Sequence, residues 1–336
     1  MEKSELTTKL KEAENAEKAD NFFAAAFFYR DSLQLAIKLQ DSKLIKLCKN
    51  KIVEMNKKSI ASGKDYKEVE ITQEISKEHQ ETLSKLIEGI LSLENITAIL
   101  KLIGEHPFFF PKVAEVEAQA KKTIPLAYQL ATLATVSNQG HTIRGSSDGS
   151  YAWFMKMYAI SQELIMTMYL DRIFHSLIYS KSKKIKLNSK KLEIYFSDSK
   201  IIDPEQMKII SVGLQRYFKK DYVSAMHILI PQLEALFLSL AQKCGIDIVA
   251  VDRKIDTATR TTTLSEHHLD SKEFKDIFGE DFCKQIKFIL FEPMGYKLRH
   301  KIAHGEVHHS ECNFRTVNLV LYIYLVLISR ASIVDK

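Results

Sequence analysis

The scarcity of glycine and proline constrains the fold of this chain more than any other feature. Only 11 Gly and 6 Pro occur in 336 residues. Because these two residue types mark most turns, their scarcity predicts few turns and long elements. Helix-forming residues dominate the remainder. Apolar residues make up 46% and charged residues 27%, which is typical of a soluble globular protein and excludes disorder and collagen-like structure. The sequence therefore predicts an all-α fold.

Residues 4–60 carry the apolar spacing of helices. An apolar stripe over residues 22–39 follows a segment in which alanine recurs every third residue. The two segments together resemble one unit of a tetratricopeptide-type helical hairpin. No second unit follows at the same period, and a repeat array needs about three. We therefore expect a helical pair and not a solenoid.

The stretch over residues 137–150 is rich in Gly, Ser and Asn and gives the strongest loop signal in the chain. It is the best candidate for a domain boundary. We expect an N-terminal helical domain over residues 1–137 and a C-terminal helical domain over residues 151–336.

One short β-hairpin is expected near residues 185–196, where the sequence alternates around Asn188-Ser189, and no other β-structure is expected. Six lysines lie within residues 181–191. They fit a solvated edge strand whose charge prevents further pairing. They also fit a surface that contacts the phosphate backbone of RNA. The lysines assigned to RNA binding are Lys183, Lys184, Lys186, Lys190 and Lys191.

Several features bear on the compartment. The most apolar run, Val317 to Ser329, is shorter than the roughly 20 residues that a membrane span requires, so we expect a buried core helix. The N-terminal segment lacks the apolar core of a secretory signal. The four cysteines form no Cys-x-x-Cys pair, which favours reduced thiols. These features predict a cytoplasmic protein that does not enter a membrane.

Arg299 and His304 together carry the residue types needed to cleave RNA without a metal. In that reaction the ribose 2′-OH attacks the neighbouring phosphate, so a proton must move and extra negative charge must be stabilised. A histidine can move the proton near neutral pH. A guanidinium supplies fixed, charge-assisted donors to the phosphate oxygens.

The spacing of this pair is weak support by itself. With 11 histidines in the chain, an arginine followed at this range of spacings by a histidine is expected roughly once by chance. Arg260 and His267 match as well, but they lie in a Thr-rich loop without apolar flanks. On one helix, residues five apart point about 140° apart. A site therefore needs a helix end near Gly305 or a second copy of the motif.

The context of the motif supplies a resemblance. Pro231-x-x-Glu234 stands upstream on an apolar helix, and the later block from Leu298 to Gly305 lies between two apolar helices. This arrangement, over about residues 204–334, resembles a bacterial HEPN-like domain family of unknown function. Its members carry a Pro-x-x-Glu helix and a Leu-Arg-Asn-x3-His-Gly block. Here His300 replaces the Asn.

The resemblance implies a C-terminal HEPN-like helical bundle, a homodimer in which two motifs share one cleft, and an endoribonuclease that acts as a toxin or in antiviral defence. It implies that Glu234 orients the arginine. The candidate catalytic residues are Arg299, His304, His300 and Glu234. The alternative is a non-catalytic HEPN-like module that binds RNA, a nucleotide or a partner protein through the N-terminal helices.

A metal site is the competing interpretation of the same segment. Residues of ligating type stand at intervals of four from His300 to Cys312. On one helix, eight residues span about 12 Å at 1.5 Å per residue, so one ion cannot reach three of them. No metal and no cofactor is expected.

Overall fold

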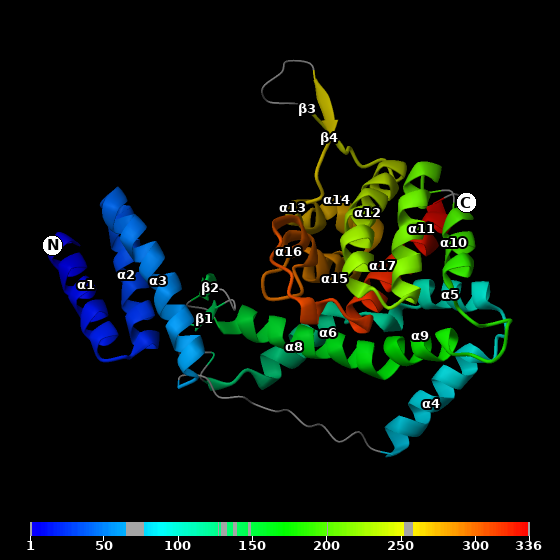
Figure 1. Cartoon of the computed structure of the whole chain (residues 1–336), viewed down its shortest axis with the longest axis horizontal. Helices are drawn as coiled ribbons and strands as arrows, with labels where there is room; N and C mark the ends of the chain where they lie inside the picture. The colour runs from blue at the N-terminus through cyan, green and yellow to red at the C-terminus, as the bar shows by residue number, and fades with distance from the viewer. Residues whose placement is uncertain are drawn as a thin grey trace. The chain divides into compact units, whose positions relative to one another are not determined.

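Figure 1 shows a computed structural model of the chain, which describes residues 2–64, 77–126, 128, 133–136, 140–146, 149–199, 201–251 and 258–334. Helices dominate these residues, and this confirms the predicted all-α class. Two short antiparallel strand pairs also occur, which the sequence did not predict. They are β1 (Leu133–Val136) with β2 (Thr142–Ser146), and β3 (Val249–Val251) with β4 (Thr259–Thr261).

The chain divides into two compact units. Unit 1 consists of Met1–Glu74 and Ile124–Ala152, and unit 2 of Ile75–Thr123 and Trp153–Lys336. This division differs from the predicted domains, because residues 75–123 belong with the C-terminal part. The physical reason is the helix α5 (Ile96–Glu105), which packs closely on α17 (Phe314–Val334). A Cβ atom at Gly104 of α5 would overlap the carbonyl oxygen of Leu325 in α17.

The described residues of the N-terminal segment of unit 1 form the helices α1 (Glu2–Lys18), α2 (Phe22–Lys38) and α3 (Ser42–Ser62). The predicted helical pair is present and is extended by the third helix. The side chains of Asn21 and Asp41 accept hydrogen bonds from the first turns of α2 and α3, which fixes where these helices begin. α2 packs against both neighbours. The hydrophobic core between these three helices is formed by Ala13, Ala25, Ala26, Tyr29, Cys48, Ile52 and Met55.

Unit 2 is a helical bundle. α8 (Gly149–Ile165) continues through a π-helical turn, η2 (Met166–Leu170), into α9 (Asp171–Ile178). Its other helices are α4 (Lys77–Leu91), α6 (Val113–Thr123), α10 (Ser189–Ser197), α11 (Pro204–Phe218), α12 (Tyr222–Lys243), α13 (Glu266–Asp270), α14 (Lys272–Phe278), α15 (Glu280–Leu290) and α16 (Leu298–His304). Single 3-10 turns occur at η1 (Pro107–Phe109) and η3 (His309–Glu311).

α17 is the central helix of unit 2. Its residues from Val317 to Ile328 are all buried, Asn318 included. It packs against α5, α12 and η2. The prediction of a buried core helix over 317–329 is confirmed. The apolar surface of this helix is therefore covered within one chain and is not available to a second copy.

The hairpin predicted near residues 185–196 is wrong, because α10 occupies most of this segment. The side chain of Asn188 accepts a hydrogen bond from the backbone N–H of Lys191 at 3.0 Å and so caps a helix. Leu192 and Phe196 are both buried. Their spacing of four is the period of a helix face and not of a strand. The ring of Phe196 stacks on Tyr324 of α17 at 5.3 Å.

Two features bear on the predicted compartment. Among the described helices, α12 is long and apolar enough to cross a membrane by length and composition. Ten of its side chains are nevertheless buried in unit 2, and a core helix passes the same test. All four cysteines are free thiols.

Candidate Arg/His site on α16

The Arg/His motif lies on α16, whose ends are fixed by left-handed backbone. Lys297 precedes the helix with φ 53°, and Gly305 ends it with φ 67°. The N–H of Glu306 donates to the carbonyl of Lys301 at 2.7 Å, which closes the helix in the way that a left-handed glycine permits. His304 is thus the last helical residue, and the helix end that the sequence required near Gly305 is present.

The segment before α16 is anchored to the bundle. Gly295 lies so close to α15 that a Cβ atom would overlap the carbonyl oxygen of Phe288. The next residue, Tyr296, donates its backbone N–H to that same oxygen at 3.1 Å. The Tyr296 hydroxyl donates to the carboxylate of Glu163 in α8. Burial, and then the charge of Glu163, raise the pKa of this hydroxyl, so it remains a donor.

Arg299 is held by Glu234 of α12, the pairing that the resemblance implied. The Arg299 Nε atom donates to Glu234 Oε2 at 3.1 Å. The other oxygen, Oε1, accepts the backbone N–H of Leu264 at 3.1 Å. The side chains of Arg299 and Glu234 are 31% and 16% exposed. Among the described residues Glu234 is the one acceptor of this guanidinium, so its terminal nitrogens remain available to a ligand.

His300 and His304 lie together on α16. Their ring centroids are 4.2 Å apart and the ring planes are inclined by 46°. His304 is exposed and His300 is half-buried. Burial, followed by the charge of Lys297, lowers the pKa of His300. The His300 Nε2 atom lies 3.8 Å from Glu306 Oε2.

Arg299 and His304 do not meet within one chain. Both lie in α16, and five helical residues rotate the side chain by about 140°. Arg299 is directed to Glu234 on α12, whereas His304 lies at the exposed helix end. One copy of the motif therefore presents its two groups in different directions.

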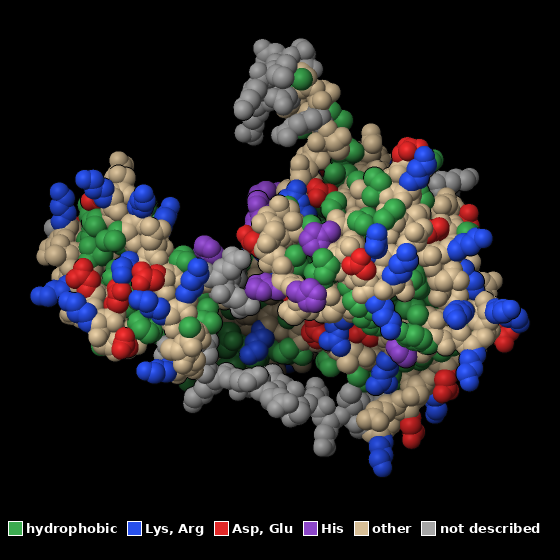
Figure 2. Space-filling model, in the orientation of Figure 1, with side chains coloured by type: hydrophobic (Ala, Val, Ile, Leu, Met, Phe, Trp, Pro, Cys, Tyr) green, Lys and Arg blue, Asp and Glu red, His purple; other side chains and the backbone are tan. Residues whose placement is uncertain are grey.

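Histidines gather around this site. Figure 2 shows their side chains on the face of unit 2 that carries α13, α16 and the turn after α16. In the part of the chain that the structure describes, no group of three or more His, Cys, Asp or Glu residues is placed to hold a metal ion.

The predicted RNA-binding lysines lie elsewhere. In Figure 1, α10 and α16 are on opposite sides of unit 2. Lys184 forms an ion pair with Glu94 at 2.7 Å. Lys191 Nζ donates to the carbonyl of Lys183 at 2.6 Å, so it stabilises the turn before α10. Of the five lysines predicted to bind RNA, those that remain exposed without an ion pair to any described residue are Lys183, Lys186 and Lys190.

Sequence reasoning missed a polar network that links five segments of unit 2. Arg315 at the start of α17 pairs with Glu163 at 2.8 Å and with Asp171 at 2.9 Å. Asn318 donates to Asp171 at 2.9 Å and accepts from the hydroxyl of Tyr217 at 2.6 Å. Since Glu163 also binds Tyr296, the network reaches the segment before α16. Its signal in the sequence was an isolated Asn within an apolar run.

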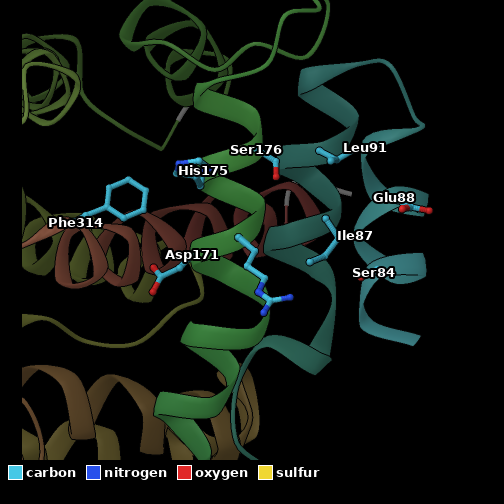
Figure 3. A pocket seen from close by; sticks show the side chains of 9 residues that line it. Ser84, Ile87, Glu88, Leu91, Asp171, His175, Ser176 and Phe314 are labelled. Carbon is cyan, nitrogen blue, oxygen red and sulfur yellow. The ribbon is translucent and has the colours of Figure 1, made fainter. Parts of the chain in front are cut away.

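A cleft of about 560 Å³ opens beside this network, between α4, α9 and the start of α17. Figure 3 shows Asp171 and His175 on the side of α9 that faces Phe314, and Ser176 on the side that faces Ile87 and Leu91. The cleft has a mixed lining, and the Arg/His motif does not contribute to it. Its lining residues are Ser84, Ile87, Glu88, Leu91, Asp171, Arg172, His175, Ser176 and Phe314.

Comparison with known proteins does not assign a family. No protein-family model, no curated protein and no solved structure matches the chain.

Proposed function

We propose that this chain is a metal-independent endoribonuclease of the HEPN type, cytoplasmic, which acts as a toxin or in antiviral defence. One observation carries the proposal. The carboxylate of Glu234 on α12 accepts a hydrogen bond from Arg299 Nε at 3.1 Å and leaves the terminal nitrogens of Arg299 available. Arg299 lies on the short helix α16, which ends at His304. The fixed cation and the exposed imidazole are the two groups that RNA cleavage by its own 2′-OH requires.

In the proposed reaction the bond between the ribose O2′ and phosphorus forms, and the bond between phosphorus and O5′ breaks. His304 takes the proton of the 2′-OH, and water supplies the proton that the departing O5′ takes up. Arg299 donates to the non-bridging oxygens, where negative charge develops. The products are a 2′,3′-cyclic phosphate and a 5′-hydroxyl. His300 is assigned as the polar neighbour that orients the His304 ring.

The divergence of Arg299 and His304 on α16 supports a homodimer. If two copies place their α16 helices side by side, the arginine of one chain can approach the histidine of the other. Closed two-fold pairs are the commonest oligomers. Because α17 is covered within each chain, the dimer contact must involve α16 and its surroundings. Light scattering tests this point, and a monomer at all concentrations would contradict it.

RNA is the proposed partner. Lys183, Lys186 and Lys190 would contact its backbone at a distance from the reacting phosphate, since α10 and α16 lie on opposite sides of unit 2 (Figure 1). Lys184 and Lys191 already form contacts within the chain, so they would contribute less to RNA binding than the sequence suggested.

The experiment that tests the proposal is cleavage of a mixed-sequence RNA by the full chain in EDTA. Arg299→Ala and His304→Ala should each abolish cleavage. Arg299→Lys should restore it only in part, because an ammonium lacks the planar fork of a guanidinium. His267→Ala, at an exposed histidine of α13, should have no effect. Full activity of His304→Ala, with its fold confirmed by circular dichroism, would refute the assignment.

One observation favours the alternative, a non-catalytic module that binds a partner protein through its N-terminal helices. Phe23, Phe27 and Ile37 of α2 are 55%, 38% and 53% exposed. At 100° per residue they lie within an arc of about 80°, so they form one apolar stripe. Under this alternative, Phe23→Ser with Phe27→Ser abolishes function, whereas Arg299→Ala leaves it unchanged.

A further inference from the structure

Among the histidines whose side chains the structure describes, His300 and His304 are distinguished by their close ring contact. Residues four apart on a helix lie on the same face, one turn above the other. Here the two imidazole centroids are 4.2 Å apart. Two histidines at this spacing on one helix face are a known arrangement for binding one metal ion. The whole pair lies within α16, before the helix ends at Gly305.

The separation fits a single ion. Zinc–nitrogen bonds measure about 2.0–2.1 Å, and two nitrogens on one tetrahedral ion are then roughly 3.3 Å apart. Rings with centroids 4.2 Å apart reach that separation by small rotations about their side-chain bonds. We propose that His300 and His304 form a two-histidine chelate for a divalent transition-metal ion.

The ligand type predicts which ions bind. Imidazole suits zinc, copper and nickel, whereas magnesium and calcium take oxygen ligands. The remaining coordination positions are filled by water, since the structure places no third protein ligand around the pair in its described part. The carboxylate of Glu306, 3.8 Å from His300 Nε2, adds negative charge beside the ion. Affinity should follow the usual order of first-row metals, with Cu²⁺ above Ni²⁺ and Ni²⁺ above Co²⁺.

An ion held there would regulate the Arg/His site. A histidine nitrogen that binds a metal has no lone pair left to accept a proton, so His304 could not serve as a base. This consequence rests on the proposed ribonuclease function, whereas the metal binding does not. A transition metal should therefore inhibit cleavage, and EDTA should restore it.

His308 offers a matched control. It stands four residues after His304, as His304 stands after His300, but it lies beyond the helix end at Gly305. If the chelate depends on the helix, it is formed by His300 and His304 and does not involve His308. His308→Ala should therefore leave metal binding unchanged.

The test is calorimetric titration of the full chain, freed of any histidine tag, with Ni²⁺, Co²⁺ and Mg²⁺. We expect one Ni²⁺ per chain and no Mg²⁺ binding. His300→Ala and His304→Ala should each weaken Ni²⁺ binding at least about tenfold, since even a partner outside the first coordination shell is worth about 10–100-fold. No Ni²⁺ binding, or equal weakening by His308→Ala, would overturn the proposal. Circular dichroism confirms the fold of each variant.

Cleavage assays separate this inference from the proposed function. If the wild-type chain cleaves RNA in EDTA, the same assay without EDTA should be inhibited by micromolar Ni²⁺, and cleavage by His308→Ala should be inhibited to the same extent. If Ni²⁺ binds to the pair but no cleavage occurs under any condition, the chelate stands and the ribonuclease proposal fails.

Discussion

Replacing Glu234 with alanine removes two interactions that hold the candidate site. Its Oε2 atom accepts Arg299 Nε at 3.1 Å, and its Oε1 atom accepts the Leu264 N–H at 3.1 Å. A glutamine cannot replace it fully, because one of its two terminal groups is a donor. The side chain of Glu234 is only 16% exposed, so water compensates for the loss only in part.

The expected cost follows from these two contacts. A buried N–H left without a partner costs about 1–3 kcal/mol, and a hydrogen bond to a charged group contributes about 1.5–3 kcal/mol. Because water can reach part of both contacts of Glu234, we expect Glu234→Ala to destabilise α12 and α16 by about 2–4 kcal/mol. Glu205→Ala is the control. Its ion pair with Lys208 is exposed, and such pairs contribute about 0–1 kcal/mol.

Hydrogen exchange of the amides in α12 and α16 reports this free energy for the elements concerned. Cleavage of RNA should fall in Glu234→Ala by up to about 100-fold, the effect of misplacing a catalytic group by about 1 Å. If exchange and cleavage in Glu234→Ala match those in Glu205→Ala, then Glu234 does not hold Arg299 and the reasoning is refuted.

Three further predictions concern the fold and the RNA surface. Asn188→Ala should destabilise α10 by about 0.5–2 kcal/mol through loss of its N-cap, seen as faster amide exchange in α10 and not in α11. Gly104→Ala should destabilise unit 2 by at least about 1–3 kcal/mol through overpacking against Leu325, whereas Gly89→Ala, with no atom within 4 Å of its Cβ position, should be neutral or stabilising in thermal unfolding. Replacing Lys183, Lys186 and Lys190 with glutamine should weaken RNA binding and flatten its dependence on salt. An unchanged salt slope would show that these three lysines do not contact RNA.

The elements that sequence predicted well are those with a long and regular apolar period. The run over 317–329 is apolar on every side, and a helix of that kind must lie in a core. The ion pair between Glu234 and Arg299 was also predicted, but from a resemblance and not from the spacing of the residues.

The differences between expectation and structure have physical causes, one local and two tertiary. Residues 185–196 alternate enough to suggest strands, yet a single side-chain cap at Asn188 and two apolar residues four apart make a helix. The compact units differ from the predicted division because Gly104 permits close packing between α5 and α17, and tertiary contact of this kind leaves no periodic signal. The network around Arg315 joins residues about 150 positions apart, which a single sequence cannot reveal.

The measurement that tests the central claim most directly is the chemistry of the cleaved end. The full chain is incubated in EDTA with an RNA that carries one 2′-deoxy substitution at a site it otherwise cleaves, and the products are analysed by mass spectrometry. The account predicts a 2′,3′-cyclic phosphate at every cleaved bond, no cleavage at the deoxy position, and no products from Arg299→Ala or His304→Ala. Cleavage at the deoxy position, or products from either variant, would contradict it.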